Sequence, residues 1–389
     1  MMWIELHILQ NFAPSCLNRD DTNSPKDCVF GGYRRARISS QCIKRSTRTH
    51  DAFGKAVVRD SGIRTKRLSE KVEKTLKARG RDADLAEAFS VAVISELVEK
   101  TNEGKTSVLL YLSPTEIERL ADKAEEHWDT AAKAAGEADD GGLSKALAAP
   151  AKKVADAYRK LHTEEFREVT DAADIALFGR MVADKRIADW NIDAACQVAH
   201  AISTHRAEME MDFYTAVDDL NPGEETGAGM MGTVEFNSSC FYRYALIDID
   251  QLASNLAGDE ELARAAVDGF LRASVAAIPT GKQNSMAAQN PPALVFAVVK
   301  EKTAMPWSLA NAFEVPVDVG RNGRLVDQSA EALAKHWERL YTVYGGQGIT
   351  AGAVCQLGEA DLGPLAEHQV ASIEDLFSTV SGAIAAGDS

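Results

Sequence analysis

The chain has 389 residues, of which 45% are hydrophobic and 26% charged, and its formal net charge is −15. This length and composition are typical of a globular protein with two or three compact units. The sequence contains no run of about 18 apolar residues, which excludes a transmembrane helix. The first residues also lack a basic segment followed by a long apolar stretch, so we expect a cytoplasmic protein without a secretion signal or membrane partner.

The negative total argues against a nucleic-acid partner, but the charge is unevenly distributed along the chain. From Tyr33 to Arg81 the sequence holds 16 Lys or Arg and four Asp or Glu, a net charge of +12. The rest of the chain therefore carries −27. A basic segment on an acidic body is typical of a protein that holds a polyanion on one surface. A solvated helix face that happens to be basic is the alternative.

Cysteine and histidine spacing gives no sign of a metal centre. The six cysteines are scattered without a C-x-x-C pair, and the eight histidines do not cluster. We therefore expect reduced thiols, with neither a metal ion nor a cofactor.

The N-terminal part of the chain begins with a predicted strand. Residues 3–9 alternate, with Glu5 and His7 on the side opposite the aliphatic residues, which predicts a half-buried strand. Residues 11–37 read as a long irregular stretch, and such loops are usually functional or disordered. Ser39 or the serine after it can then cap a helix that ends at Gly54.

The middle of the chain reads as one mainly helical block over residues 58–169. Within it, residues 113–116 (Ser-Pro-Thr-Glu) combine a serine cap, a proline at the first helical position and a glutamate at the third. Residues 131–151, rich in alanine with an Asp-Asp-Gly-Gly run, are the predicted flexible loop of the chain.

The last part of the chain alternates strands and helices. Residues 214–233 read as an exposed glycine-rich excursion with apolar residues at its tip. Strands are predicted over 240–249 and 293–300, and helices over 259–277 and 327–343. Strand–helix–strand units around a helical insertion predict an α/β fold with a ferredoxin-like core.

Eight segments of the chain carry recognisable motifs, namely residues 14–21, 26–27, 30–41, 174–181, 199–205, 215–220, 241–245 and 309–314. In these segments the chain resembles the CasC family, the guide-RNA-binding backbone subunit of the type I-E CRISPR surveillance complex Cascade. The resemblance covers nearly the whole chain in order, and it is weakest over 60–165.

The resemblance implies an α/β (α+β) protein with a ferredoxin-like palm of the RNA-recognition-motif (RRM-like) type, a helical fingers insertion and a projecting thumb. The implied ranges are a discontinuous palm over 1–57, 170–205 and 236–389, fingers over 58–169 and a thumb over 206–235. Copies of the subunit stack side by side along the guide RNA as a helical filament. The implied partners are this RNA, target DNA and other Cascade subunits, in antiviral DNA targeting without a catalytic role.

Binding a guide of any sequence requires contacts to phosphate and sugar rather than to base edges. The residues expected to make them are Asn18, Arg19, Lys26, Ser39, Ser40, Gln41, Lys44, Arg45 and Arg48. Lys44 and Arg48 are four residues apart on the predicted helix and so share a face, and the start of that helix is itself an anion site. For Arg34, Arg35 and Arg37, ion pairing with a neighbour's acidic face remains an alternative to RNA binding.

The resemblance also implies that a second set of residues wedges between nucleotides. This set is Met181, Phe213, Tyr214, Thr215, Val217 and Met231. Wedging tolerates any sequence because every base has an apolar face. The alternative is that these side chains pack against their own palm.

The rival hypothesis is a metal-dependent, RNA-cleaving backbone subunit that uses a loop aspartate. Asp20, Asp21 and Asp27 follow the first strand, and hydrolysis would need a carboxylate or metal on the scissile phosphate. Ion pairing or loop capping is the simpler role, since Arg19 and Lys26 are neighbours. A third hypothesis, a pure protein scaffold, predicts that no RNA accompanies the protein.

Overall fold

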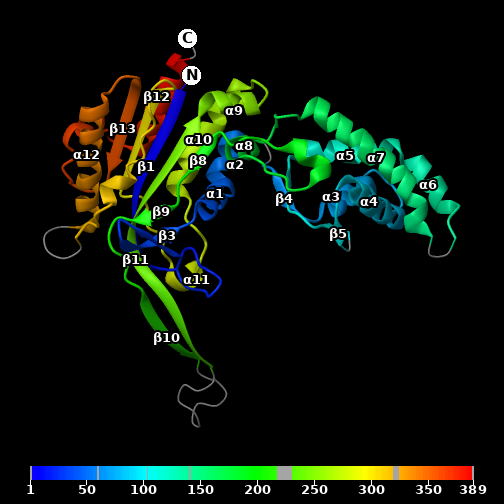
Figure 1. The fold of residues 1–389 in the computed structure, drawn as a ribbon, viewed down its shortest axis with the longest axis horizontal. Coiled ribbons are helices and arrows are strands. Elements are labelled where there is room, and N and C mark those ends of the chain that lie inside the picture. Colours follow the sequence, from blue (N-terminus) through cyan, green and yellow to red (C-terminus); the bar gives the residue numbers. More distant parts are fainter. Residues whose placement is uncertain are drawn as a thin grey trace, which may run out of the picture. The chain divides into compact units, whose positions relative to one another are not determined.

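A computed structural model describes residues 2–58, 61–102, 104–139, 142–216, 230–318 and 324–387. The chain divides into two compact units (Figure 1). The first, called here the sheet unit, consists of Met1–Ala56, Gln197–Ile249 and Val267–Ser389. The second, the helical unit, consists of Val57–Cys196 and Asp250–Ala266. Among the described helices, none combines the length and the apolar character that crossing a membrane requires.

The sheet unit is built on a mainly antiparallel sheet with the strand order β13-β12-β1-β11-β9-β3-β2, and β8 and β10 also pair with β11. Its strands are β1 (Met2–Ser15), β2 (Asp27–Phe30), β3 (Tyr33–Ile38), β8 (Cys196–Val198), β9 (Ala201–Ser203), β10 (Glu210–Ala216), β11 (Met230–Asp248), β12 (Leu294–Glu301) and β13 (Ile349–Gln356). Strand β1 is central and antiparallel to both neighbours, so that Leu6 lies opposite Ala245 on β11 and Ala297 on β12. The predicted mixed α/β fold is confirmed at this level.

The first strand is buried on both faces, so the prediction of a half-buried strand is wrong. The side chains of Glu5 and His7 are fully buried. Glu5 Oε1 is 3.0 Å from Nζ of Lys300 on β12, and His7 Nδ1 is 2.9 Å from the hydroxyl of Tyr242 on β11. Partners on both neighbouring strands therefore replace part of the water that these polar groups lose, while Glu5 Oε2 and His7 Nε2 face each other at 3.5 Å.

Helices cover both faces of the sheet. The helices of the sheet unit are α1 (Ser40–Arg48), α2 (Asp51–Val57), the second part of α10 (Glu260–Ala276), α11 (Gln283–Met286), α12 (Leu325–Tyr344) and α13 (Ile373–Gly387), with 3-10 turns η2 (Ala310–Phe313) and η3 (Gly363–His368). Helix α9 (Ile249–Asn255) and the first part of α10 are assigned to the helical unit. On one face, Trp337 of α12 packs on Phe296 with their ring centroids 5.0 Å apart. On the other face, Ile43 and Phe270 lie over Ile8. The helices predicted over 259–277 and 327–343 are confirmed as α10 and α12.

The stretch predicted to be irregular, residues 11–37, contains a β-hairpin. Strand β1 continues to Ser15, and β2 pairs with β3 through a turn at Gly31 and Gly32, whose φ angles are 60° and 83°. Gly31 leaves no room for a side chain, because a Cβ would lie 2.0 Å from the carbonyl oxygen of Glu314. A two-residue Gly-Gly turn is a hairpin signal, and the prediction missed it.

The helix predicted from Ser39 to Gly54 forms as two helices, α1 and α2, with a break at residues 49–50. Ser39 caps the first of them, since its Oγ accepts a hydrogen bond from the amide of Cys42 at 3.3 Å. This cap sets where the basic face of α1 begins.

The helical unit contains the residues over which helices were predicted, 58–169, and extends beyond them to Cys196 and to Asp250–Ala266. Its other helices are α3 (Leu68–Ala78), α4 (Ala83–Leu97), α5 (Pro114–Glu126), α6 (Trp128–Gly136), α7 (Leu143–Glu165), α8 (Ala173–Phe178) and η1 (Lys185–Trp190). Its short strands are β4 (Ile63–Thr65), β5 (Thr101–Asn102), β6 (Lys105–Thr106) and β7 (Leu110–Leu112). Leu120, Phe89, Val154 and Trp190 belong to its apolar core.

Two local predictions in the helical unit have opposite outcomes. The capping box is confirmed: Ser113 Oγ accepts from the Glu116 amide at 3.1 Å, and a Glu116 carboxylate oxygen accepts from the Ser113 amide at 2.7 Å. The flexible loop predicted over 131–151 is wrong for most of its length, because α6 ends at Gly136 and α7 begins at Leu143. Alanine favours the helix more than any other residue, and the alanines on both sides of residues 137–142 belong to these helices.

Candidate nucleic-acid interface

In the sheet unit, the loop between β1 and β2 is tied to the start of α1. Asn18 makes both connections: its Oδ1 accepts from the amide of Ser39 at 2.8 Å, and its carbonyl accepts from the amide of Lys26 at 2.9 Å. Asn18 and the buried Ser39 are therefore occupied in holding the loop on the helix. These hydrogen bonds fix the loop backbone at Arg19 and Lys26.

The side chains that remain at this surface are cationic or polar. Arg19, Gln41 and Arg45 are exposed, and Lys26, Lys44 and Arg48 are partly exposed. Arg19 lies flat along the loop, because its Nη1 donates to Asn23 Oδ1 at 3.0 Å. The loop and α1 together therefore carry several cationic side chains that solvent reaches.

His200 completes the start of α1. Its Nδ1 accepts a hydrogen bond from the amide of Ser40 at 3.2 Å. Burial lowers the pKa of His200, and the charges of Arg37 and Lys26 lower it further. The imidazole is thus held neutral, which is the state that can accept from Ser40.

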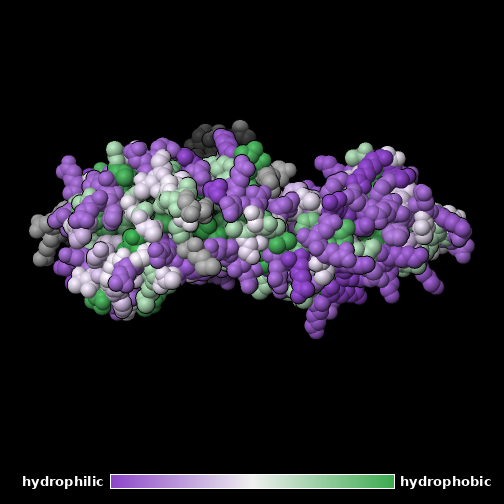
Figure 2. Space-filling view, turned by 90° about the horizontal axis from the view of Figure 1, so that it is seen from above, coloured by the Kyte–Doolittle hydropathy of each residue, from purple (hydrophilic) through white to green (hydrophobic). Residues whose placement is uncertain are grey.

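The basic segment from Tyr33 to Arg81 divides between the two units, and part of its charge is paired with acidic side chains. In the helical unit, Arg79 pairs with Glu118 and with Asp122 of α5, and Lys77 pairs with Glu73. On the face seen in Figure 2, polar and charged side chains cover most of the helical unit. The net charge of +12 therefore overstates the positive surface that a polyanion would meet.

The three arginines of β3 differ in their surroundings. Arg34 forms an ion pair with Asp27 on the neighbouring strand of the hairpin. Arg35 is fully buried, and its guanidinium donates to the carbonyls of Ser203, Phe313 and Glu314. A side chain buried in this way is not available to a neighbour's acidic face or to RNA.

The loop aspartates make local contacts. Asp20 Oδ1 accepts from the amide and the hydroxyl of Thr22, at 2.9 and 2.8 Å, and from the amide of Ser24 at 3.0 Å. These hydrogen bonds, first the one from the Thr22 hydroxyl, lower the pKa of the Asp20 carboxyl. The described residues hold no group of three or more His, Cys, Asp or Glu side chains placed to bind a metal ion. Asp20 therefore acts as a turn cap, and Asp27 as the ion-pair partner of Arg34.

Strands β10 and β11 extend beyond the sheet as a two-stranded ribbon (Figure 1). The pairing of β1 with β11 ends at Asn237, and the preceding residues of β11 pair with β10. Phe213 is 61% exposed and Tyr214 48% exposed, so neither packs into the core of its own unit. Met211, 72% exposed and two residues before Phe213, shares its face; the sequence prediction missed it, although the spacing of two was visible.

Three of the predicted wedging residues are incompletely placed. Thr215 pairs with Met231 through the backbone of the ribbon. Their side chains, and the whole of Val217, lie outside the described residues.

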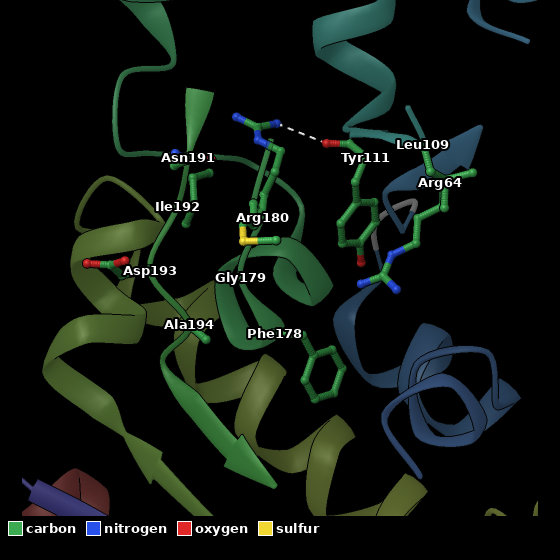
Figure 3. A pocket seen from close by; sticks show the side chains of 11 residues that line it. Arg64, Leu109, Tyr111, Phe178, Gly179, Arg180, Asn191, Ile192, Asp193 and Ala194 are labelled. Atoms are coloured by element: carbon green, nitrogen blue, oxygen red, sulfur yellow. Dashed lines mark hydrogen bonds between the residues drawn. The ribbon is translucent and has the colours of Figure 1, made fainter. Parts of the chain in front are cut away.

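Met181 belongs to the helical unit, where it lines a hollow of about 590 Å³ (Figure 3). The other residues of the hollow are Arg64, Leu109, Tyr111, Phe178, Gly179, Arg180, Asn191, Ile192, Asp193 and Ala194. The side chain of Met181 is 87% exposed. It therefore presents apolar surface to whatever occupies the hollow.

A buried ion pair supports this hollow. Nη1 of Arg180 donates to both carboxylate oxygens of Glu116, at 2.7 and 2.9 Å, and His162 Nε2 lies 2.7 Å from one of them. Burial by itself raises the pKa of Glu116, but the hydrogen bond with His162 and the charge of Arg180 outweigh it, so the net pKa is lowered. Glu116 is thus an ionised carboxylate that holds α5 against the segment of Met181.

Known proteins resemble this chain over nearly its whole length. A family model described as CT1975-like protein matches residues 4–380. A chain of a solved structure described as "CRISPR RNA-guided surveillance complex, pre-nicking" shares 32% sequence identity and a TM-score of 0.82, over 98% of this chain and 99% of that chain. A chain of a second structure, "CRISPR RNA-guided surveillance complex", shares 28% identity and a TM-score of 0.72 over the same fractions. Among curated proteins, no sequence matches.

The fold is therefore one that chains of CRISPR surveillance complexes also adopt, an antiparallel sheet with a large helical insertion. The chain belongs to the CT1975-like protein family and is homologous to the chains of both surveillance complexes. The predicted kinship with a CRISPR surveillance subunit is confirmed at this level.

Proposed function

We propose that this protein is the repeated backbone subunit of a type I-E CRISPR surveillance complex, Cascade, and binds guide RNA without reading its sequence. In this role it has no catalytic activity, and copies stack side by side along the RNA together with target DNA and other subunits. The observation that carries the proposal is the match, at 32% identity and over 98% of the chain, to a chain of an RNA-guided surveillance complex.

The strand order supports the finer description of the fold. The central strands run β12-β1-β11-β9, all antiparallel, and α10 lies between β11 and β12 in the chain. This order is that of a ferredoxin-like or RRM-like sheet and supports the palm. The helices between Val57 and Cys196 support the fingers, and the β10–β11 ribbon supports the thumb.

The chemistry of the loop and α1 supports RNA binding through the sugar–phosphate backbone. Arg19, Lys26, Lys44, Arg45 and Arg48 bind phosphates in the proposed complex, and Gln41 donates at the first turn of α1, where backbone amides favour an anion. Asn18, Ser39 and Ser40 position this surface through the hydrogen bonds described above.

The exposed ribbon supports a second type of contact. The side chains of Phe213 and Tyr214 offer apolar faces to unstacked bases, and so does Met181 in the helical unit. Stacking of this kind accepts any base. We assign the same role to Thr215, Val217 and Met231 on the family resemblance alone.

The proposal is tested by substituting alanine for Lys44, Arg45 and Arg48 together. Wild-type protein from cells that express a guide carries an RNA of defined length on a denaturing gel, and the triple variant carries none. With purified single-stranded RNA, the slope of log affinity against log salt becomes less steep by about two for the variant, because each phosphate contact contributes about 0.7.

A matched control removes the same charge elsewhere. Alanine at Arg67, Lys71 and Lys74, all exposed and in the helical unit, leaves the guide RNA bound. If the Lys44/Arg45/Arg48 variant still assembles on RNA with an unchanged salt slope, the assigned surface is wrong. A wild-type protein that never carries RNA would instead favour the pure scaffold.

A further inference from the structure

Of the residues that line the hollow of the helical unit (Figure 3), Met181 is the one to which the proposed function assigns a contact with guide RNA. Arg64 and Tyr111 lie directly opposite each other on the paired strands β4 and β7. The guanidinium carbon of Arg64 is 4.2 Å from the centre of the Tyr111 ring. The two side chains thus form a stacked cation–aromatic pair on one wall of the hollow.

The Tyr111 ring is fixed in place from behind. Its hydroxyl donates to Asp174 Oδ2 at 2.5 Å, and Asp174 Oδ1 accepts from the amide of Gly62 at 2.8 Å. Gly62 in turn packs so closely that a Cβ there would lie 2.7 Å from the ring of Tyr111 and from Ile175. The ring is therefore a rigid support, and it orients the guanidinium of Arg64, which is itself exposed.

The rim of the hollow is apolar and exposed. Leu109 is 55% and Met181 is 87% exposed, and both line the hollow with Arg64. A volume of about 590 Å³ lies within the range of small-ligand sites. Asp193 also lines the hollow, with its carboxylate directed away from Arg64 (Figure 3).

We propose that this hollow binds an unstacked nucleobase of the single-stranded nucleic acid that the protein holds, with the base stacked on the guanidinium of Arg64. A base has a flat apolar face that suits an arginine plane or an aromatic ring. The phosphates of its strand are attracted to the charge of Arg64. The inference rests on the proposed function, and it adds Arg64, Tyr111 and Leu109 to the nucleic-acid contacts.

The test uses the complete complex, assembled on guide RNA that carries 4-thiouridine at one position at a time. Irradiation of the wild-type complex gives crosslinks to peptides that contain Arg64, Leu109–Tyr111 or Met181. A second arm places 4-thiothymidine in the complementary DNA strand. Crosslinks in the first arm identify the guide as the source of the base, and those in the second identify the target strand.

Two variants separate stacking from charge. Arg64→Ala loses both the plane and the charge, and Arg64→Lys keeps only the charge. We expect both to reduce the crosslinks at the hollow by about tenfold, a change that corresponds to the loss of one stacked base, while guide RNA remains bound. The control is Arg67→Ala, an exposed cation three residues away that pairs with Glu70, and it leaves the crosslinks unchanged.

Each outcome has a separate meaning. Guide RNA bound with no crosslink at the hollow, or with crosslinks insensitive to both Arg64 variants, overturns the inference and leaves the proposed function standing. A protein–protein crosslink from a second copy into the hollow also overturns it. A wild-type protein without any nucleic acid overturns the proposed function, and the inference fails with it.

Discussion

The ring of Tyr214 lies over Gly232, its direct cross-strand partner in the β10–β11 ribbon. A Cβ at Gly232 would lie 2.5 Å from the hydroxyl oxygen of Tyr214 and 2.6 Å from its ring. The Tyr214 ring can therefore occupy this position only because Gly232 has no side chain. The sequence alone does not reveal this dependence, because the two residues are 18 positions apart.

A Gly232→Ala substitution tests the role of this contact in RNA binding. The added methyl group displaces Tyr214 from its place, and we expect the affinity for single-stranded RNA to fall about tenfold, the value of one stacked base. Fluorescence anisotropy at fixed salt measures the change. Gly136→Ala is the control, since a Cβ at that position meets nothing within 4 Å; equal affinities for the two variants would remove Tyr214 from the interface.

The Glu116–Arg180 ion pair is expected to carry much of the stability of the helical unit. Glu116→Gln leaves Arg180 buried without a counter-charge, which lowers the free energy of unfolding by about 3–5 kcal/mol. Urea denaturation measures the loss. Glu118→Gln, which removes a partly exposed partner of Arg79, changes it by less than about 1 kcal/mol, and similar losses in both variants would refute the distinction.

Because Asp20 caps a turn, we expect its removal to loosen the loop between β1 and β2 without changing any RNA cleavage. Purified complex incubated with target RNA and Mg²⁺ leaves the RNA intact, for the wild type and for Asp20→Ala alike. The variant is cleaved faster by protease between β1 and β2, because the hydrogen bonds to Thr22 and Ser24 are lost. RNA cleavage by the wild type that Asp20→Ala abolishes would establish the nuclease hypothesis instead.

Because His7 is buried, we expect the free energy of unfolding to decrease in mild acid. Burial lowers its pKa below the ordinary value of 6.5 and outweighs the hydrogen bond and charge of Glu5, which raise it; the charge of Lys300 lowers it further. The neutral imidazole is therefore favoured in the folded state, and the unfolded chain binds the additional proton. The free energy of unfolding consequently falls as pH drops below about 6.5, by at most about 1.4 kcal/mol per pH unit for this group.

A His7→Gln variant isolates this contribution. Its stability, measured by urea denaturation between pH 7.5 and 5, depends less steeply on pH than that of the wild type. Burial also lowers the pKa of His200, His205 and His336, so a residual slope of the same sign remains. An unchanged slope would show that His7 is not protonated on unfolding in this range.

Sequence patterns correctly predicted those elements that depend on interactions between residues close together in the chain. The helix over 327–343 follows from its apolar spacing, and the cap at Ser113 follows from a motif whose partners are three residues apart. The β2–β3 hairpin was not predicted, although its Gly-Gly turn was visible in the sequence. Its true place depends on Arg35, which reaches carbonyls of residues 203, 313 and 314.

The residues of the candidate interface were also predicted only in part from the sequence. Sequence motifs alone indicated the basic face of α1 and the apolar residues of the ribbon. They could not show that the side chain of Asn18 is used to tie the loop to the start of α1, or that Arg79 is neutralised by α5. A charge count along the chain ignores the acids that folding brings beside it.

The sequence by itself determined the family, the helical insertion, the helix caps and the main RNA-contact candidates, because motifs and periodic patterns record short-range requirements. Only the tertiary structure decided that Glu5 is buried against Lys300 and that Arg64 stacks on Tyr111. Those pairs are 295 and 47 residues apart. Strand register and packing bring them together, and no pattern along one segment of the chain contains that information.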